Sequence, residues 1–204
     1  LVIGIFWLIV LCSVSIWAPY DPLEAVSPRL LAPSMSHLLG TDALGRDVLT
    51  RVLFGARESM PIAAAVIICA TVIGTLLGAV AGYAGGWVDA VVMRITDVVM
   101  AFPAILLAMA ISAALGPGLR NGFIAILIVW WPIYARLVRG QVLSIKQREH
   151  VEAAISIGAT RRRILQKHVM PMAITPVLVN ATMDFGQVVL FLASLSFLGL
   201  GALP

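Results

Sequence analysis

The stretch PIAAAVIICATVIGTLLGAVAGY, residues 61–83, decides the fold class of this chain. It is 23 residues long and contains no charged side chain. As an α-helix rising about 1.5 Å per residue it is about 34 Å long, enough to span a hydrocarbon layer of about 30 Å with some tilt. Because lipid offers the backbone no hydrogen-bond partner, this run predicts a membrane helix.

Other parts of the chain have the same apolar character. Of the 204 residues, 61% are hydrophobic and only 12% are charged, whereas an average soluble domain has about 25% charged residues. We therefore expect an all-α, polytopic membrane protein. The other four expected spans lie at residues 1–20, 98–119, 121–135 and about 172–193.

Basic residues are distributed unevenly between the two sets of loops. If the first span enters from the cytoplasm, loops 84–97 and 134–174 hold nine basic residues and the outer loops hold five. The positive-inside rule therefore places 134–174 in the cytoplasm. We divide the chain into a first transmembrane helix at 1–20, an extracytoplasmic segment at 21–60 and a transmembrane core at 61–204.

The extracytoplasmic segment contains an amphipathic pattern between residues 37 and 59. Its apolar face consists of Val48, Leu49, Val52, Leu53 and Ala56. On the other side, Asp47 and Arg51 are four residues apart and are expected to pair. The pattern predicts a helix lying on the outer membrane surface, and it would equally suit a docking face for an external partner.

Small residues form a stripe in the span at 61–83. Gly74, Gly78 and Gly82 lie four residues apart on one helix face, so they favour close helix packing, either within the chain or at a subunit interface. Three spans also contain proline, which removes a backbone donor and predicts kinks, at Pro103, Pro132 and Pro176.

The last span carries one acidic residue, Asp184. An unpaired carboxylate at the middle of a membrane costs at least about 2.5 kcal/mol, so Asp184 should face a cavity or pair with another helix. Asn180 and Gln187 lie on the same helix face. The three residues form a polar stripe that either lines a pathway or makes interhelical hydrogen bonds.

The segment EHVEAAISIGATRRRILQKHVMP, residues 149–171, is unusually polar for this chain. Its pattern predicts two short helices with a bend at Gly158; the second begins near Arg161 and Pro171 is expected to end it. The small alanines 153 and 154 would let another surface come close, and Glu152 can meet an arginine there. We call residues 149–171 the elbow. It is either a basic loop that binds lipid headgroups or a protruding docking surface for a cytoplasmic partner.

The elbow resembles the EAA signature of the membrane subunits of ABC importers. The matching residues are Glu152-Ala153-Ala154, Gly158 six positions after the glutamate, and Val169-Met170-Pro171. Stretches at 38–57, 81–97, 131–143 and 195–201 resemble the dipeptide, oligopeptide and nickel branch of that family, in particular its second, C-type permease. Leu192-Ala193 stands where the family often has Glu-Ala.

This resemblance implies the type I ABC importer permease fold, with a further span after residue 204. It implies that the elbow is a coupling helix on the ATP-hydrolysing subunit, with coupling residues Glu152, Ala153, Ala154, Gly158 and Arg161. The implied partners are a B-type permease, cytoplasmic ATP-binding subunits, an extracytoplasmic substrate-binding protein and membrane lipid. The implied location is the bacterial cytoplasmic membrane.

The expected cargo is a peptide, a dipeptide in particular. Nickel chelates or haem are the alternatives within the class, and a stand-alone secondary transporter is the alternative outside it. The chain has no G-x-x-x-x-G-K-[ST] loop, so ATP and Mg are expected in the partner subunits, with no catalytic, cofactor or metal site here. The dispersed arginines predict no binding to nucleic acid.

Overall fold

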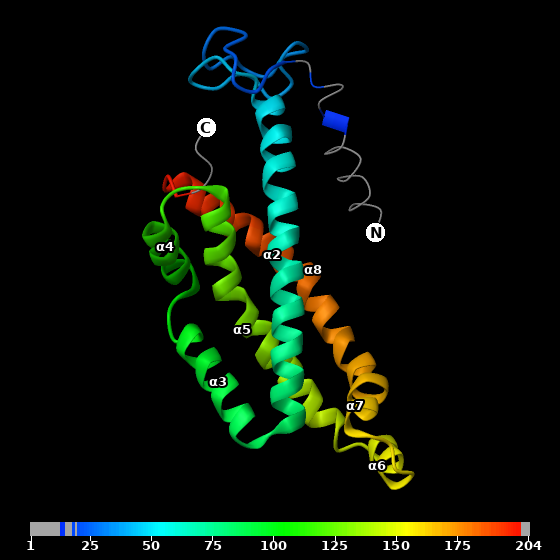
Figure 1. Cartoon of the computed structure of the whole chain (residues 1–204). Helices are drawn as coiled ribbons and strands as arrows, with labels where there is room; N and C mark the ends of the chain where they lie inside the picture. Colours follow the sequence, from blue (N-terminus) through cyan, green and yellow to red (C-terminus); the bar gives the residue numbers. More distant parts are fainter. Residues whose placement is uncertain (1–12, 15–17, 19, 201–204) are drawn as a thin grey trace. The chain divides into compact units, whose positions relative to one another are not determined.

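The structure is a computed structural model that describes residues 13–14, 18 and 20–200. Regular structure in these residues is helical, with a single β-bridge between Thr41 and Asp47, and the expected all-α fold is confirmed (Figure 1). The helices are α2 (Val48–Ala84), α3 (Gly86–Met100), α4 (Ala104–Leu115), α5 (Leu119–Ile145), α6 (Glu149–Ser156), α7 (Arg161–Ile164), the π-helix η1 (Leu165–Val169) and α8 (Met170–Phe197). The expected span at 1–20 falls outside the described residues except at four positions.

Among the described residues, three helical segments are long and apolar enough to cross a membrane. They are Val48–Ala84, Leu119–Ile145 and Arg161–Phe197. Helices α3 and α4 pass the same test only as a pair, and they are bent by 89° where they meet. If that pair counts as one broken span, the described part of the chain holds four.

The expected span at 98–119 is therefore not one continuous helix, and the kink expected at Pro103 is present as a full break. Helix α3 ends at Met100 and α4 begins at Ala104, with Pro103 in its N-cap position at φ −57° and ψ 123°. Proline has no backbone N–H, and it disfavours helical backbone at the preceding residue, Phe102. By contrast, α5 and α8 continue through Pro132 and Pro176.

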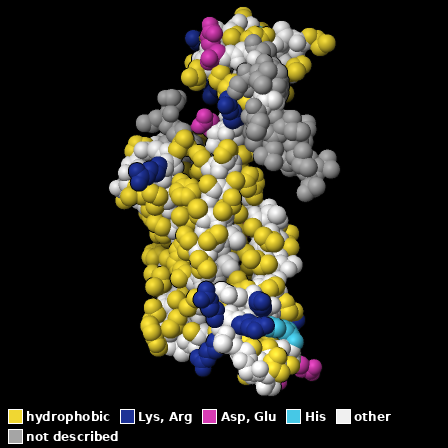
Figure 2. All heavy atoms as spheres, turned by 45° about the vertical axis from the view of Figure 1, so that its right-hand side comes forward, with side chains coloured by type: hydrophobic (Ala, Val, Ile, Leu, Met, Phe, Trp, Pro, Cys, Tyr) yellow, Lys and Arg dark blue, Asp and Glu magenta, His cyan; other side chains and the backbone are white. Residues whose placement is uncertain are grey.

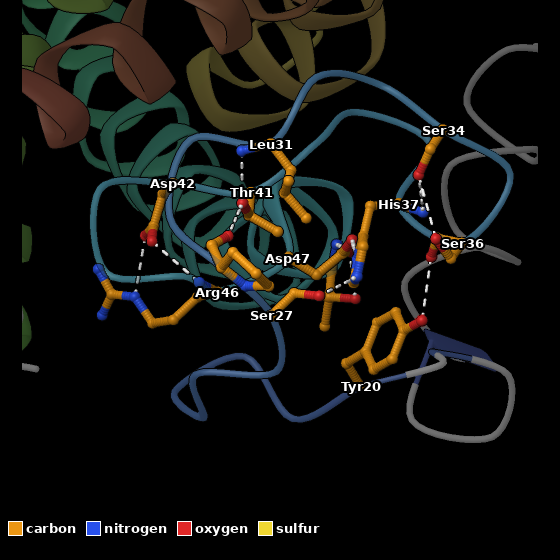
Figure 3. A network of polar contacts seen from close by, with 12 residues as sticks. Tyr20, Ser27, Leu31, Ser34, Ser36, His37, Thr41, Asp42, Arg46 and Asp47 are labelled. Carbon is orange, nitrogen blue, oxygen red and sulfur yellow. Dashed lines mark hydrogen bonds and ion pairs between the residues drawn. The ribbon is translucent and has the colours of Figure 1, made fainter.

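The chain divides into two compact units, residues 1–61 and 62–204. In the first unit, side-chain hydrogen bonds hold together the loop that precedes α2 (Figure 3). His37 is buried there, with Nδ1 3.0 Å from Asp47 Oδ1 and Nε2 3.0 Å from Ser27 Oγ. The hydroxyl of Thr41 donates to the carbonyl of Pro28 at 2.7 Å.

Two expectations for this segment are wrong. Asp47 does not pair with Arg51; it caps α2, because its Oδ2 accepts from the backbone N–H and the hydroxyl of Thr50, both at 2.8 Å. Arg51 donates instead to Asp42. The apolar face at 48–56 belongs to the first turns of α2 rather than to a separate surface helix, because no residue between Asp47 and Ala84 ends the helix.

Hydrogen bonding keeps both carboxylates of this loop charged. The backbone N–H of Arg46 is the main cause that holds the pKa of Asp42 far below its usual range, with help from the Arg46 and Arg51 side chains. Burial alone would raise the pKa of Asp47, but donation from Thr50 and from His37 outweighs burial and lowers it. The stability that such carboxylates contribute is present above their ordinary pKa and is lost as pH falls through the lowered value.

Replacing Asp47 with alanine should open this loop locally. The change removes the helix cap and leaves buried His37 without its carboxylate, at a combined cost of about 2 kcal/mol. In amide hydrogen exchange at neutral pH, the protection factors of residues 20–50 should fall by more than about tenfold. The exposed Glu24→Ala is the control; equal exchange in both variants would contradict the capping role.

Helix α5 is the centre of the second unit. One face of it is buried along its length, and α3, α4 and α8 all pack against it. In Figure 1, α3 and α4 lie along one side of α5 while α8 crosses it. The π-helix and α7 connect α8 back to α6 at one end of this unit, so the polar segment is attached directly to the packed helices.

The glycine stripe of α2 lies against α5. A Cβ atom added at Gly78 would lie 2.3 Å from the carbonyl oxygen of Ala135, and one added at Gly74 would lie 2.5 Å from the Cβ of Tyr134. At Gly82 the nearest atom, the carbonyl oxygen of Arg139, would be 3.0 Å away. The absence of side chains at these three positions lets the two backbones approach within the chain.

Candidate functional site

The first arm of the elbow is α6, residues Glu149–Ser156. Glu149 and Glu152 lie in its first turn, where negative charge interacts favourably with the helix dipole. Val151 and Ala154 are buried against the rest of the unit, whereas Glu152 and Ala153 are exposed. The expectation that both alanines face a partner is therefore wrong for Ala154, whose small side chain instead lets α6 pack closely onto its own chain.

Gly158 ends α6 in a Schellman motif. Its φ is +79°, in the left-handed region that favours glycine. The N–H of Gly158 donates to the carbonyl of Ile155 at 2.9 Å, and that of Ala159 donates to the carbonyl of Ala154 at 3.1 Å. These two bonds satisfy the last carbonyls of α6 and reverse the chain, so the bend predicted at Gly158 has a definite geometry.

The second arm begins at Thr160, whose hydroxyl accepts from the N–H of Arg163 at 3.4 Å. The expectation that Pro171 ends this arm is wrong, because α7 passes through the π-helix Leu165–Val169 into α8. A proline lacks a donor for the carbonyl four residues earlier and its ring collides with that carbonyl. The wider π turn just before Pro171 changes the hydrogen-bond register there, so helical structure continues past the proline.

Two exposed isoleucines give the elbow an apolar surface. Ile155 is 57% exposed and Ile157 is 86% exposed, next to the exposed Glu152. Sequence reasoning did not single them out, although large aliphatic residues in a polar, non-membrane segment were the signal that would have found them. Arg161 is exposed at the start of the second arm. The elbow thus combines an apolar contact surface with charges of both signs.

Ion pairs between α3 and α5 also escaped the sequence analysis. The guanidinium of Arg139 donates to both oxygens of Asp89, at 3.0 and 2.6 Å, and Arg136 donates to Asp97. Arg136 therefore pairs with a carboxylate of the neighbouring helix. These contacts join residues about 40 to 50 positions apart, so local spacing did not reveal them.

Asp184 pairs with a second helix. The hydroxyl of Tyr134, on α5, donates to Asp184 Oδ2 at 2.9 Å. Tyr134 is fully buried and Asp184 is partly exposed on α8. Of the other two residues of the expected stripe, Asn180 is partly buried and Gln187 is exposed. One side of Asp184 therefore stabilises the contact between α5 and α8, while its partial exposure leaves it open to the surroundings.

Helix α8 is less covered than the other two continuous spans. In the most apolar window of Arg161–Phe197, 17% of the residues are buried within this chain, compared with 50% for Leu119–Ile145 and 44% for Val48–Ala84. A span with so little cover from its own chain must be surrounded by lipid or by another subunit. Among the described residues, no group of three or more His, Cys, Asp or Glu side chains is placed to hold a metal ion.

Residues 74–204 match the family described as binding-protein-dependent transport system inner membrane component. The chain belongs to this family, and it is an inner-membrane protein. The match covers the glycine stripe, the α3–α5 ion pairs, the elbow and Asp184, so all of these features lie within the family domain. The resemblance drawn from the EAA-like residues is thereby confirmed at the level of the family.

Individual relatives extend the similarity over nearly the whole chain. It is 43% identical over 208 residues to the dipeptide transport system permease protein DppC of Alkalihalophilus pseudofirmus, covering 98% of this chain and 68% of the relative. It is 43% identical over 186 residues to the probable D,D-dipeptide transport system permease protein DdpC of Escherichia coli, covering 91% and 62%. It is 42% identical over 207 residues to the glutathione transport system permease protein GsiD of Pectobacterium atrosepticum, covering 98% and 68%. The chain thus spans about two thirds of the length of these relatives.

Proposed function

We propose that this chain is a membrane-spanning permease subunit of an ATP-driven importer and forms half of a path for peptides. The observation that carries the proposal is the family match over 74–204, in which the elbow has an ordered bend at Gly158 and an exposed apolar surface. The chain itself is not an enzyme in this proposal. Partner subunits bind ATP and Mg and carry out hydrolysis.

The proposed partners follow from the two exposed surfaces. The elbow docks on a cytoplasmic ATP-binding subunit through Glu152, Ala153 and Arg161, with Ile155 and Ile157 as its apolar contacts. A homologous B-type permease packs against α8 and supplies the other half of the path. A substrate-binding protein delivers the cargo at the outer face.

The packing of the elbow offers a mechanical route from ATP to the membrane. Helix α6 contacts α7 and η1, and these continue into α8, which carries Asp184. ATP can shift the permease between two states only if its subunits bind the elbow more tightly in one of them. Displacement of α6 in that state would move α8 against α5 and thereby change access to the path.

The relatives favour a peptide as cargo, since those reported above are named for transport of a dipeptide, a D,D-dipeptide or glutathione. The test is uptake of a labelled dipeptide into vesicles that hold the full-length chain with its neighbouring transporter subunits. ATP-dependent uptake supports the proposal. An assembly that hydrolyses ATP without dipeptide uptake moves the cargo to longer peptides, nickel chelates or haem. Uptake by the chain without an ATPase would overturn the proposal in favour of a stand-alone transporter.

Asp184 can be tested with a pair of substitutions. Asp184→Asn removes the charge but keeps an oxygen that accepts from Tyr134, whereas Tyr134→Phe keeps the charge and removes the donor. If the carboxylate serves the path, Asp184→Asn should lower uptake about tenfold or more, with unchanged ATPase-subunit binding, and Tyr134→Phe should have a small effect.

If Tyr134→Phe had the larger effect and Asp184→Asn the smaller one, Asp184 would be assigned to helix packing. In that case Tyr134→Phe should weaken assembly, because the loss of a hydrogen bond to a carboxylate costs about 1.5–3 kcal/mol. Co-purification of the ATPase subunits separates the two results, since a path defect leaves the assembled complex intact.

A further inference from the structure

Two ion pairs join α3 to α5, and the pair between Asp97 and Arg136 is the more open of them. The side chains of Asp97 and Arg136 are 58% and 50% exposed, whereas those of Asp89 and Arg139 are 18% and 34% exposed. Arg139 donates to both oxygens of Asp89, but Arg136 donates to Asp97 through a single N–H. Within the described part of the chain, the other donors of Arg136 and the second oxygen of Asp97 have no hydrogen-bond partner. The pair therefore keeps donors and an acceptor available for a ligand.

The pair lies where the apolar stretches of the chain meet more polar segments. Asp97 comes directly before residues 98–119 and Arg136 directly after residues 121–135, and neither stretch contains a charged residue. Figure 2 shows one face of this unit, which hydrophobic side chains cover along most of its length. In the orientation that the basic loops favour, the pair lies at the cytoplasmic end of both stretches.

The exposed surface of α3 has an apolar side and a polar side. One stripe at helical spacing is apolar and suits lipid; it consists of Trp87, Val91, Ile95 and Val98. The exposed stripe beside it consists of Ala90, Arg94 and Asp97. On α5, an exposed stripe with four-residue spacing consists of Arg136, Gly140 and Ser144. The ion pair joins these two polar stripes, so water or a polar ligand suits this surface better than a lipid tail.

The pair also lies at the same depth as the contact between Tyr134 and Asp184. Tyr134 and Arg136 are two positions apart on α5, which corresponds to about 3 Å along the helix axis. At this depth α5 therefore makes one polar contact with α8 and another with α3. Both contacts include a carboxylate that is at least partly exposed.

We propose that Asp97 and Arg136 bind the two charged ends of a peptide at the cytoplasmic end of the path. This inference rests on the proposed function and names the residues that recognise the cargo there. Arg136 pairs with the terminal carboxylate, for which its planar guanidinium is suited, and Asp97 pairs with the terminal ammonium. An extended dipeptide is about 7 Å long, so it can lie between the two side chains when they separate. Without cargo the two side chains neutralise each other, so neither charge is left unpaired beside the apolar stretches.

The test measures protection of a thiol placed one turn from Arg136 in the full-length chain, assembled with its partner subunits in nanodiscs. Gly140→Cys supplies the thiol, because an added Cβ there would meet no atom within 4 Å, and Cys12→Ala with Cys69→Ala removes the other two. Reaction with iodoacetamide is followed by mass spectrometry of this chain. Dialanine should slow the reaction. N-acetyl-dialanine and dialanine amide, which each lack one terminal charge, should need about tenfold or higher concentrations for the same protection.

Variants of the pair assign each end of the peptide to one side chain. Asp97→Asn should remove the preference for dialanine over its N-acetyl form, and Arg136→Gln should remove the preference for dialanine over its amide. Arg139→Gln is the matched control, since it breaks the less exposed of the two ion pairs between the same helices and should keep both preferences. Each preference is a ratio within one variant, so a lower yield of assembled complex does not alter it.

Three results would overturn the proposal. Equal protection by all three peptides would show that the terminal charges are not recognised at this site. Loss of both preferences in Arg139→Gln as well would reduce the two ion pairs to helix packing. A thiol at position 140 that reacts only after the partner subunits are removed would show that a subunit covers the surface. If dipeptide uptake is intact while any of these results is found, this site is wrong and the importer function stands; if the assembled wild type takes up no peptide, the proposed function itself fails.

Discussion

Gly158→Val should abolish peptide uptake while the assembled transporter still hydrolyses ATP. Gly158 has φ +79°, and an added Cβ would meet no atom within 4 Å, so the cost arises from the backbone alone. A side chain in the left-handed region costs about 1–2 kcal/mol, and more for a β-branched residue. The strain is relieved if the two Schellman hydrogen bonds break. The loss of these bonds would displace the docking surface of the elbow. We expect uptake to fall by more than about tenfold, since 1.4 kcal/mol corresponds to a factor of ten.

The control for this variant is Gly158→Asn, because asparagine tolerates left-handed backbone far better than valine. Uptake and ATP hydrolysis are measured side by side in the same vesicles. The asparagine variant should keep most of the uptake, and the valine variant should lose it. Unchanged uptake in Gly158→Val would rule out a coupling role for the bend, whatever the state of the rest of the elbow.

The features that could be predicted from the sequence are those that depend on local pattern. Residues 61–83 predicted a membrane helix because an uncharged run of that length has few other stable conformations in lipid. The bend at Gly158 followed from a glycine placed after a short helical pattern. Asp47 could have been recognised as a helix cap, since it precedes an apolar run; its spacing to Arg51 instead suggested an ion pair within a helix that begins only at Val48.

The features that sequence reasoning missed depend on contacts between distant residues or on the competition between two local rules. Tyr134 and Asp184 are 50 positions apart, as are Asp89 and Arg139, and single-sequence spacing does not show which helices meet. At Pro103 the sequence predicted a kink within one span, and the proline instead separates two helices that are bent by 89°. At Pro171 the same chemistry had the opposite result, because a π turn accommodated the ring.

The second large effect is expected at the contact between α2 and α5. Gly78→Ala should destabilise the protein by about 2–3 kcal/mol, because a Cβ 2.3 Å from the carbonyl oxygen of Ala135 forces two backbones apart. The higher helix propensity of alanine, about 1 kcal/mol, offsets only part of this cost. Thermal unfolding of the purified protein in detergent measures the loss.

A graded series makes this prediction specific to the stripe. Gly74→Ala, with its nearest atom at 2.5 Å, should be almost as damaging as Gly78→Ala, and Gly82→Ala, at 3.0 Å, should be milder. Gly55→Ala is the control on the same helix, since its Cβ would meet nothing within 4 Å and the change should be neutral or stabilising. If Gly78→Ala left the isolated chain as stable as the Gly55→Ala control but released the partner permease, the glycine stripe would belong to a subunit interface. A loss of stability in the isolated chain, ranked as the distances rank, would instead show that the three glycines set the separation of α2 and α5.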